Sequence, residues 1–234
     1  MLVSTAAYSR PSHFVEALGS REIQYSIKLS LVTCTITSLL SLLVAVPIGF
    51  LLSRKKFWGK TIVEAALDIP IVLPPMVIGL CLLILFQTWF GKTVEKVIPF
   101  TYTVYGVVLA QWVIGSAFAI RTMRGTFDHL SPRFEDVAMT LGCTRARAVW
   151  SVTLPAAWRG MLAAASVAWA RSLGEFGPIL VFAGATRMKT EVLPTTVWLE
   201  LSVGNLEAAV AVSLLLVLFA MVVLVAVRWI GERV

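Results

Sequence analysis

The sequence predicts an all-α integral membrane protein with about five transmembrane helices and a helical loop on the cytoplasmic side, between the third and fourth of them. Three observations predict this class. Of the 234 residues, 58% are apolar and only 14% are charged, whereas soluble globular chains are about 45–50% apolar and about 25% charged. The mean hydropathy is +0.86. The apolar residues also gather in long runs, so the sequence argues against a water-soluble enzyme.

A helix that crosses the hydrocarbon core of a bilayer needs about 20 mostly apolar residues. Residues 1–24 are too polar to contain the core of a secretory signal, and we expect them to form an extracytoplasmic segment ahead of an uncleaved anchor. Residues 25–230 are expected to form a single transmembrane domain. The stretches long and apolar enough to span are 25–52, 62–90, 103–120, 156–182 and 206–230.

The positions of the basic residues predict the orientation of the chain. Twelve of the 20 Lys and Arg follow the first, third and fifth runs, seven lie on the other side, and Arg171 lies inside the fourth run. Cytoplasmic segments carry an excess of Lys and Arg. The N-terminus is therefore predicted outside and the C-terminus inside, in a multi-pass protein of the cell (inner) membrane. Topology accounts for the net charge of +7, and no nucleic-acid partner is expected.

The second run is interrupted by Pro70, Pro74 and Pro75. Each proline removes a backbone donor and clashes with the preceding turn. In lipid, neighbouring helices or water must compensate such a break, which makes Pro74 and Pro75 candidates for the wall or gate of a pathway. A kink that only improves helix packing is the alternative.

The loop that follows the third run, residues 121–155, carries its own helix signals. Ser131 is suited to cap a helix that has Pro132 at its first position, and Gly142 suits the end of that helix. Glu135 and Asp136 in the first turn complement the helix dipole. Apolar residues recur at helical spacing along this segment, at Phe134, Val137, Ala138 and Leu141.

A second, shorter helix is predicted within the same loop, capped by Thr144 and continuing through Trp150 to end before Leu154-Pro155. A cytoplasmic helix held at both ends by membrane helices is shaped to dock on a partner. The alternative is an amphipathic helix that lies on the bilayer surface.

The loop resembles a known motif. Asp136-Val137-Ala138, three residues, Gly142, nine residues, Val152, one residue and Leu154-Pro155 match the spacing of the EAA loop of ABC importer permeases, with Asp for Glu, Val for Ala and Val for Ile. The resemblance implies the type I importer fold, in which residues 131–155 form a coupling helix seated on a separate ATPase subunit. The expected docking residues are Glu135, Asp136, Ala138, Gly142, Arg145, Arg147, Leu154 and Pro155.

Two further segments are similar to the permeases for molybdate and tungstate and, more distantly, sulfate. The first is Leu73-Pro74-Pro75. The second runs from Ala170 to Gly177 and includes Glu175-Phe176-Gly177, and Thr190, Leu193 and Pro194 follow it. The resemblance therefore implies an oxyanion substrate, most plausibly molybdate or tungstate.

Arg171 and Glu175 lie within the fourth run at i, i+4, so on a helix they share a face and can pair. An ionisable residue at membrane depth is costly and points to function. Either the pair faces a pathway, where Arg171 offers a cation to an oxyanion, with Ser172 and Gly177 as further pathway or gate candidates, or the pair neutralises itself and is structural. Gly174, Gly177 and Pro178 are expected to break the helix.

No site for nucleotide hydrolysis is expected on this chain. A P-loop needs a glycine five residues before Gly-Lys-Ser/Thr. Gly59-Lys60-Thr61 has Arg54 at that position, and Gly91-Lys92-Thr93 has Phe86. The three cysteines have no ligand-like spacing, so neither a metal site nor a cofactor is expected here, and no catalytic residue is assigned. ATP and Mg would be bound by the partner ATPase.

The resemblance also implies the rest of an assembly. A second copy of the chain would complete the pathway as a homodimer, an extracytoplasmic binding protein would deliver the substrate, and the transporter would work by alternating access. A sulfate or thiosulfate permease is the alternative within this class, and an amino-acid permease is a more remote one. Outside the class, the alternatives are a secondary transporter or channel that needs no ATPase, and a membrane-embedded enzyme.

Overall fold

The computed structural model describes residues 19–233, and this part of the chain is helical and without strands. Most of the polar segment predicted over residues 1–24 lies outside the described residues. The elements are α3 (Arg21–Arg54), α4 (Lys60–Val72), α5 (Pro75–Gln87), α6 (Trp89–Glu95), α7 (Val104–His129), α8 (Arg133–Thr140), α9 (Arg145–Ala148), η1 (Val149–Thr153), α10 (Leu154–Ala156), α11 (Trp158–Leu173), η2 (Ile179–Ala183), α12 (Leu193–Val203) and α13 (Leu206–Arg233).

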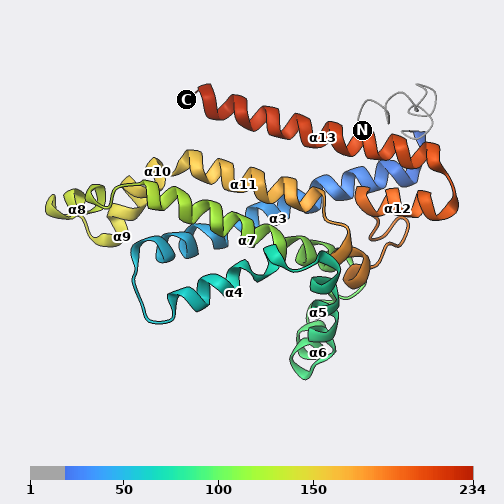
Figure 1. Ribbon diagram of the computed structural model, residues 1–234, viewed down its shortest axis with the longest axis horizontal. Coiled ribbons are helices and arrows are strands. Elements are labelled where there is room, and N and C mark those ends of the chain that lie inside the picture. Colours follow the sequence, from blue (N-terminus) through green and yellow to red (C-terminus); the bar gives the residue numbers. More distant parts are fainter. Residues whose placement is uncertain (1–18, 234) are drawn as a thin grey trace.

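Five segments run alternately back and forth along the long axis of the molecule: α3, α4, α7, α11 and α13 (Figure 1). The centre of the bundle is made by α3, α7 and α11, while α13 packs beside α11 and α12. Helices α8 and α9 stand at one end of the axis and α12 at the other, and α5 and α6 turn away from the bundle. The start of α3 and the end of α13 therefore lie towards opposite ends.

Small and polar residues hold the central helices together. Gln111 on α7 accepts a hydrogen bond from Thr37 of α3 (3.3 Å) and donates to the carbonyl of Ser172 on α11 (3.2 Å). Ser38 of α3 donates to the carbonyl of Ala165 on α11 (2.7 Å). Helices in membranes associate through such close packing and interhelical hydrogen bonds, because lipid offers no hydrophobic driving force between them. These contacts fix α3, α7 and α11 as a unit.

The predicted apolar runs coincide with helices, but in the described part of the chain three or four helices, rather than five, qualify as membrane spans by length and composition. Within residues 19–233, three helices are long and apolar enough to cross a membrane, Arg21–Arg54, Val104–His129 and Leu206–Val225, and the pair α4–α5 makes a fourth if it counts as one bent span. Helix α11 has 16 residues, shorter than a full crossing. Five spans therefore stay a prediction.

The break in the second run is present, and it is sharp. The chain bends by 112° between α4 and α5. Pro74 is the N-cap of α5 and Pro75 its first residue, where the missing N–H of proline costs nothing. Pro70 differs from the prediction, because α4 continues through it to Val72. The chain therefore bends only at Leu73-Pro74.

The loop is shorter and more helical than the sequence predicts. Helix α7 runs on to His129, so residues 121–129 belong to the bundle. The second loop helix does not end before Leu154-Pro155, since α9 passes through η1 directly into α10. The π-turn η1 directly precedes Leu154-Pro155, and such a widened turn is where a helix accommodates a local irregularity. Helices α6 and α12 were not predicted.

Candidate functional site

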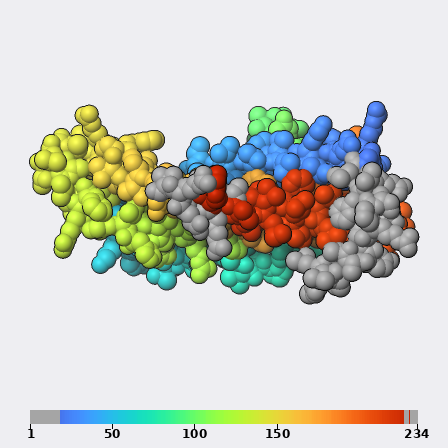
Figure 2. Space-filling model, turned by 90° about the horizontal axis from the view of Figure 1, so that it is seen from above, coloured from blue at the N-terminus to red at the C-terminus, as the bar shows by residue number. Residues whose placement is uncertain are grey.

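The first candidate site is the loop at the end of the bundle, formed by α8, α9 and η1. Helix α8 buries Glu135 and Ala138 and exposes its apolar residues Phe134, Val137 and Leu141. Leu141 is 81% exposed and Trp150 of η1 is 74% exposed. In the space-filling view these elements form a lobe that stands clear of α13 (Figure 2). The apolar stripe predicted on α8 therefore faces outward, away from the bundle.

Gly142 ends α8 in the way that the sequence predicts. Its φ is +89°. The N–H of Gly142 donates to the carbonyl of Met139 (3.0 Å), and the N–H of Cys143 donates to the carbonyl of Ala138 (3.1 Å). This is a Schellman end, which favours glycine at the left-handed position. A Cβ built on Gly142 meets no atom of the described chain within 4 Å, so the space beside it is open.

The start of α8 differs slightly from the prediction. Pro132 is the N-cap and Arg133 the first helical residue, while the hydroxyl of Ser131 accepts from the N–H of Arg133 at 3.4 Å. The second cap is as predicted, because the hydroxyl of Thr144 accepts from the N–H of Arg147 at 3.4 Å.

Glu135 lies behind this surface rather than on it. Its Oε1 accepts a hydrogen bond from Nε of Arg54 at 2.9 Å, and the two side chains are only 6% and 8% exposed. The remaining expected docking residues divide into two groups. Asp136, Arg145 and Arg147 are exposed on the lobe. Leu154 and Pro155 instead line an apolar groove of about 920 Å³ against α3.

The second candidate site is the place where two helix breaks meet. A Cβ on Gly177, in the turn after α11, would lie 2.9 Å from the backbone nitrogen of Met76 at the start of α5. Further along the same two segments, the rings of Phe86 of α5 and Phe182 of η2 pack with centroids 5.1 Å apart. The sequence singled out both breaks separately, and the structure brings them together.

Arg171 and Glu175 form an ion pair next to this contact, with Nη2 and Oε1 2.6 Å apart. Helix α11 ends at Leu173, so Glu175 lies in the turn beyond the helix. Its side chain is 2% exposed, whereas that of Arg171 is 40% exposed and stacks over the ring of Phe118 at 5.1 Å. Ser172 is buried and its hydroxyl bonds to the carbonyl of Ala168.

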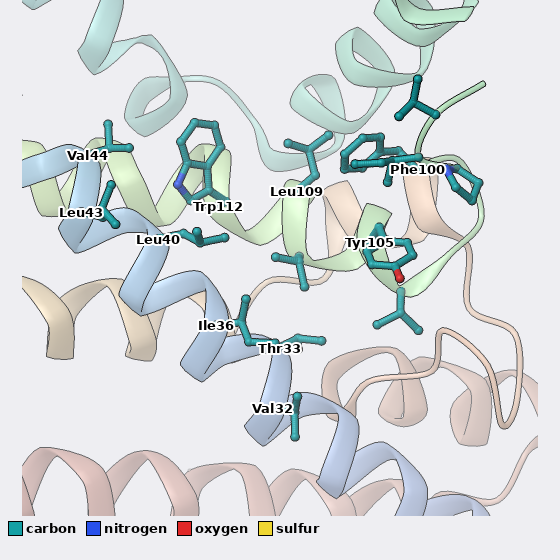
Figure 3. Close-up of a pocket in the computed structure, with 15 residues that line it drawn as sticks. Val32, Thr33, Ile36, Leu40, Leu43, Val44, Phe100, Tyr105, Leu109 and Trp112 are labelled. Carbon is teal, nitrogen blue, oxygen red and sulfur yellow. The ribbon is translucent and has the colours of Figure 1, made fainter. Parts of the chain in front are cut away.

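A large groove on another face is not suited to an anion. It has a volume of about 640 Å³ and lies between α3, α7 and the segment before α7 (Figure 3). Its lining is almost entirely aliphatic and aromatic, and among the described residues it includes no charged side chain. Thr33, Tyr105 and Trp112 are the polar residues in it. Such a surface suits lipid chains rather than an oxyanion.

Sequence reasoning missed a charged cluster at the end of the bundle opposite the lobe. Arg187 pairs with Glu22 at the start of α3 and with Glu200 of α12 (2.9 Å to the latter). Nearby, Glu191 is fully buried, and its carboxylate oxygens make no hydrogen bond of good geometry among the described residues, although Thr196 and the backbone of Met188 lie close enough to lower its pKa. Burial raises the pKa of Glu191 above its ordinary value. Glu191 directly follows Thr190, which is part of the sequence resemblance to the molybdate and tungstate permeases, and this position could have drawn attention to it.

Comparison with known proteins decides the family. Residues 45–234 match the family described as "Binding-protein-dependent transport system inner membrane component". The chain belongs to this family. Its members are the permease subunits of ABC importers, so the resemblance of the EAA loop is confirmed.

Several relatives share much of the sequence. The chain is 36% identical to a probable molybdenum ABC transporter permease protein of Haloferax volcanii, over 87% of this chain and 74% of that one. It is 30% identical to the molybdenum transport system permease protein of Haemophilus influenzae, over 89% and 93% of the two chains. It is 28% identical to the sulfate transport system permease protein of Escherichia coli, over 99% and 85%.

Solved structures support the same fold. A bacterial ABC transporter involved in the import of the acidic polysaccharide alginate superposes with a TM-score of 0.76 at 17% identity, over 98% of this chain and 87% of that one. A complex of a bacterial alginate ABC transporter with an alginate pentasaccharide-bound periplasmic protein gives 0.78 at 16% identity, over 99% and 86%. At these identities the likeness shows the fold of this permease, not its substrate.

Proposed function

We propose that this permease carries an oxyanion, molybdate or tungstate, into the cell as part of an ATP-driven importer, and that the lobe of α8, α9 and η1 is its ATPase-docking surface. The observation that carries the docking proposal is the outward apolar stripe of α8, with Leu141 81% exposed. Exposed apolar patches rimmed by polar residues mark protein interaction sites. Exposed Asp136, Arg145 and Arg147 supply such a rim.

The expected docking residues take different parts in this proposal. Asp136, Gly142, Arg145 and Arg147 contact the ATPase, together with the apolar stripe. Glu135 and Ala138 support the helix from behind, and Leu154 and Pro155 join the loop to α11. A helix lying flat on the bilayer is the alternative. It fits less well, because the lobe stands beyond the ends of α3 and α4 along the bundle axis (Figure 1).

The likeness to molybdenum permeases at 36% and 30% identity supports the substrate class. The likeness to a sulfate permease at 28% keeps a sulfate or thiosulfate permease as the second candidate. In this chain the half-exposed Arg171, which pairs with Glu175 and stacks over Phe118, would face the pathway, because a guanidinium recognises oxyanions.

The assembly and its orientation belong to the same proposal. Two copies of the chain form a homodimer around the pathway, a binding protein delivers the anion on the outer side, and ATP with Mg is bound by two ATPase subunits. The excess of basic residues in the loop segments supports an orientation with α8 and the C-terminus in the cytoplasm. ATP-driven closure of the ATPase pair then moves the two lobes and switches the cavity from inward-open to outward-open.

Co-purification with the ATPase subunit tests the docking surface. Leu141→Asp puts a charge into the apolar stripe, and we expect the ATPase subunit to be lost from the purified permease. The matched control is Leu206→Asp at the first position of α13, which is 54% exposed at the opposite end of the bundle and should leave the complex intact. Retention of the ATPase by Leu141→Asp would contradict the docking proposal.

Uptake into vesicles tests the substrate. The assembled transporter, supplied with its binding protein and ATP, is expected to accumulate molybdate or tungstate in preference to sulfate. Accumulation of sulfate alone would favour the second candidate, and uptake without any ATPase subunit would favour a secondary transporter.

A further inference from the structure

Arg54 joins three separate segments at the base of the lobe. It is the last residue of α3, and its guanidinium uses three nitrogens. Nε donates to Glu135 in the first turn of α8, Nη1 to the carbonyl of Phe127 at the end of α7, and Nη2 to the carbonyl of Leu130 after α7, each at 2.9 Å.

The surroundings make this joint rigid. The side chain of Arg54 is 8% exposed, its guanidinium lies 5.9 Å from the centre of the Phe50 ring, and that ring packs edge-on against Phe127 at 5.5 Å. A guanidinium is a planar fork whose donors are fixed relative to one another. Three acceptors, two at the end of α7 and one on α8, are thereby held by a single side chain of α3.

We propose that Arg54 is a positioning residue that makes α8 move as one body with α3 and α7, so that displacement of the lobe reaches two membrane helices. The inference rests on the proposed docking of the lobe to an ATPase. Helix α8 is joined to α7 only by residues 130–132, where backbone rotation would let it pivot. The Arg54 bonds to Phe127 and Glu135 lie on both sides of that short segment, the bond to Leu130 lies within it, and together they block the pivot.

Other ion pairs at this end of the bundle do not perform the same task. Arg124 pairs with Glu64 at 3.1 Å and ties α7 to α4 without touching α8. Within residues 19–233, Arg54–Glu135 is the only ion pair between α8 and a long bundle helix. The sequence did not single out Arg54 for this role, because its three partners are distant along the chain.

The first test uses the complete transporter with its ATPase subunits and binding protein. For Arg54→Gln we expect the ATPase subunits to co-purify and the basal rate of ATP hydrolysis to stay near wild type. Stimulation by the loaded binding protein, and anion uptake, should fall about tenfold, within the 5–150-fold range of a lost coupling free energy. Lys55→Gln is the control: it removes the same charge at the next position, where the side chain is exposed.

A second test separates positioning from simple loss of stability. Spin labels are placed on exposed Leu51 of α3 and exposed Thr140 of α8. The wild type should give one narrow distance distribution, and Arg54→Gln a broad one. Glu135→Gln, which keeps the side-chain shape, should also broaden it. Exchanging the two residues should not restore it, because a carboxylate at position 54 cannot donate to the carbonyls of Phe127 and Leu130.

Failure of the Arg54 proposal can be told apart from failure of the proposed docking of the lobe to an ATPase. If no ATPase subunit binds the wild-type permease, the docking proposal fails, and the distance measurement on the permease alone still tests the joint. If Arg54→Gln keeps both a narrow distribution and full stimulation, as Lys55→Gln should, the inference about Arg54 is overturned.

Discussion

Gly177 and Met76 lie so close together that a single added carbon would bring a side chain within 2.9 Å of the Met76 backbone nitrogen. The two residues belong to helix breaks about a hundred positions apart in the sequence. Because the neighbouring atom is backbone, it cannot move aside as a flexible side chain does. The contact therefore couples the start of α5 to the turn between α11 and η2.

Gly177→Ala should push these two breaks apart. We expect a loss of about 1–3 kcal/mol, the usual cost of overpacking a tight contact, seen as a lower melting temperature in detergent, together with reduced anion uptake. Gly125→Ala is the control, since a Cβ there meets nothing within 4 Å and alanine favours the helix. Equal behaviour of the two variants would argue against a tight contact at Gly177.

Gly142→Asn tests whether the open space beside Gly142 belongs to a partner. Asparagine tolerates the left-handed conformation better than other side chains, so we expect normal membrane insertion but loss of the co-purifying ATPase. Gly204→Asn is the control, because it introduces the same left-handed backbone strain at the end of the bundle opposite the lobe. Gly204 has a φ of +84°, and a Cβ there would meet no atom within 4 Å. The ATPase should remain bound to that variant. Loss in both variants would point to strain rather than docking.

The Arg171–Glu175 pair should respond unequally to removal of its two members. Arg171→Gln leaves Glu175, which is 2% exposed, without its cation, whereas Glu175→Gln leaves an arginine that is 40% exposed. Breaking a fully buried pair costs about 3–5 kcal/mol, and the partial exposure of Arg171 reduces this value. We expect the melting temperature to fall more in Arg171→Gln than in Glu175→Gln. The reverse order would mean that an unpaired Arg171 destabilises the fold more than an unpaired Glu175, and would contradict this assignment.

Glu191→Gln should stabilise the permease in a pH-dependent way. Burial raises the pKa of Glu191 above 4.5 and outweighs the lowering by Thr196, Arg187 and the backbone of Met188, while Glu200 raises the pKa slightly further. A carboxyl with a raised pKa in the folded state stabilises the protein fully below pH 4.5, and this contribution is lost as the pH rises through the raised value. Glutamine stays neutral throughout.

The measurement is the melting temperature of both proteins in detergent from pH 4.5 to 8. The advantage of Glu191→Gln should be small at the acid end and should grow as the pH rises. A difference that does not change with pH would mean that folding does not raise the pKa of Glu191.

Local patterns in the sequence were sufficient for some parts of this protein. The Schellman end of α8 at Gly142, the cap at Thr144, and the breaks near Pro74 and Gly177 depend on backbone chemistry within a few residues, which the sequence displays directly. The EAA-type spacing identified the family for the same reason. Helices α6 and α12 were not predicted, and α7 extended beyond its apolar run because helical propensity does not end where apolarity ends.

Only the tertiary structure decided how segments distant in the sequence contact one another. Sequence alone determined an all-helical membrane protein of the ABC importer permease family, through its composition, apolar runs and loop motif. It could not tell that Glu135 points inward to Arg54, that Gly177 touches Met76, or that Glu191 is buried. Each of these depends on which helix faces lie together, and packing among α3, α7 and α11 sets that arrangement rather than any local preference.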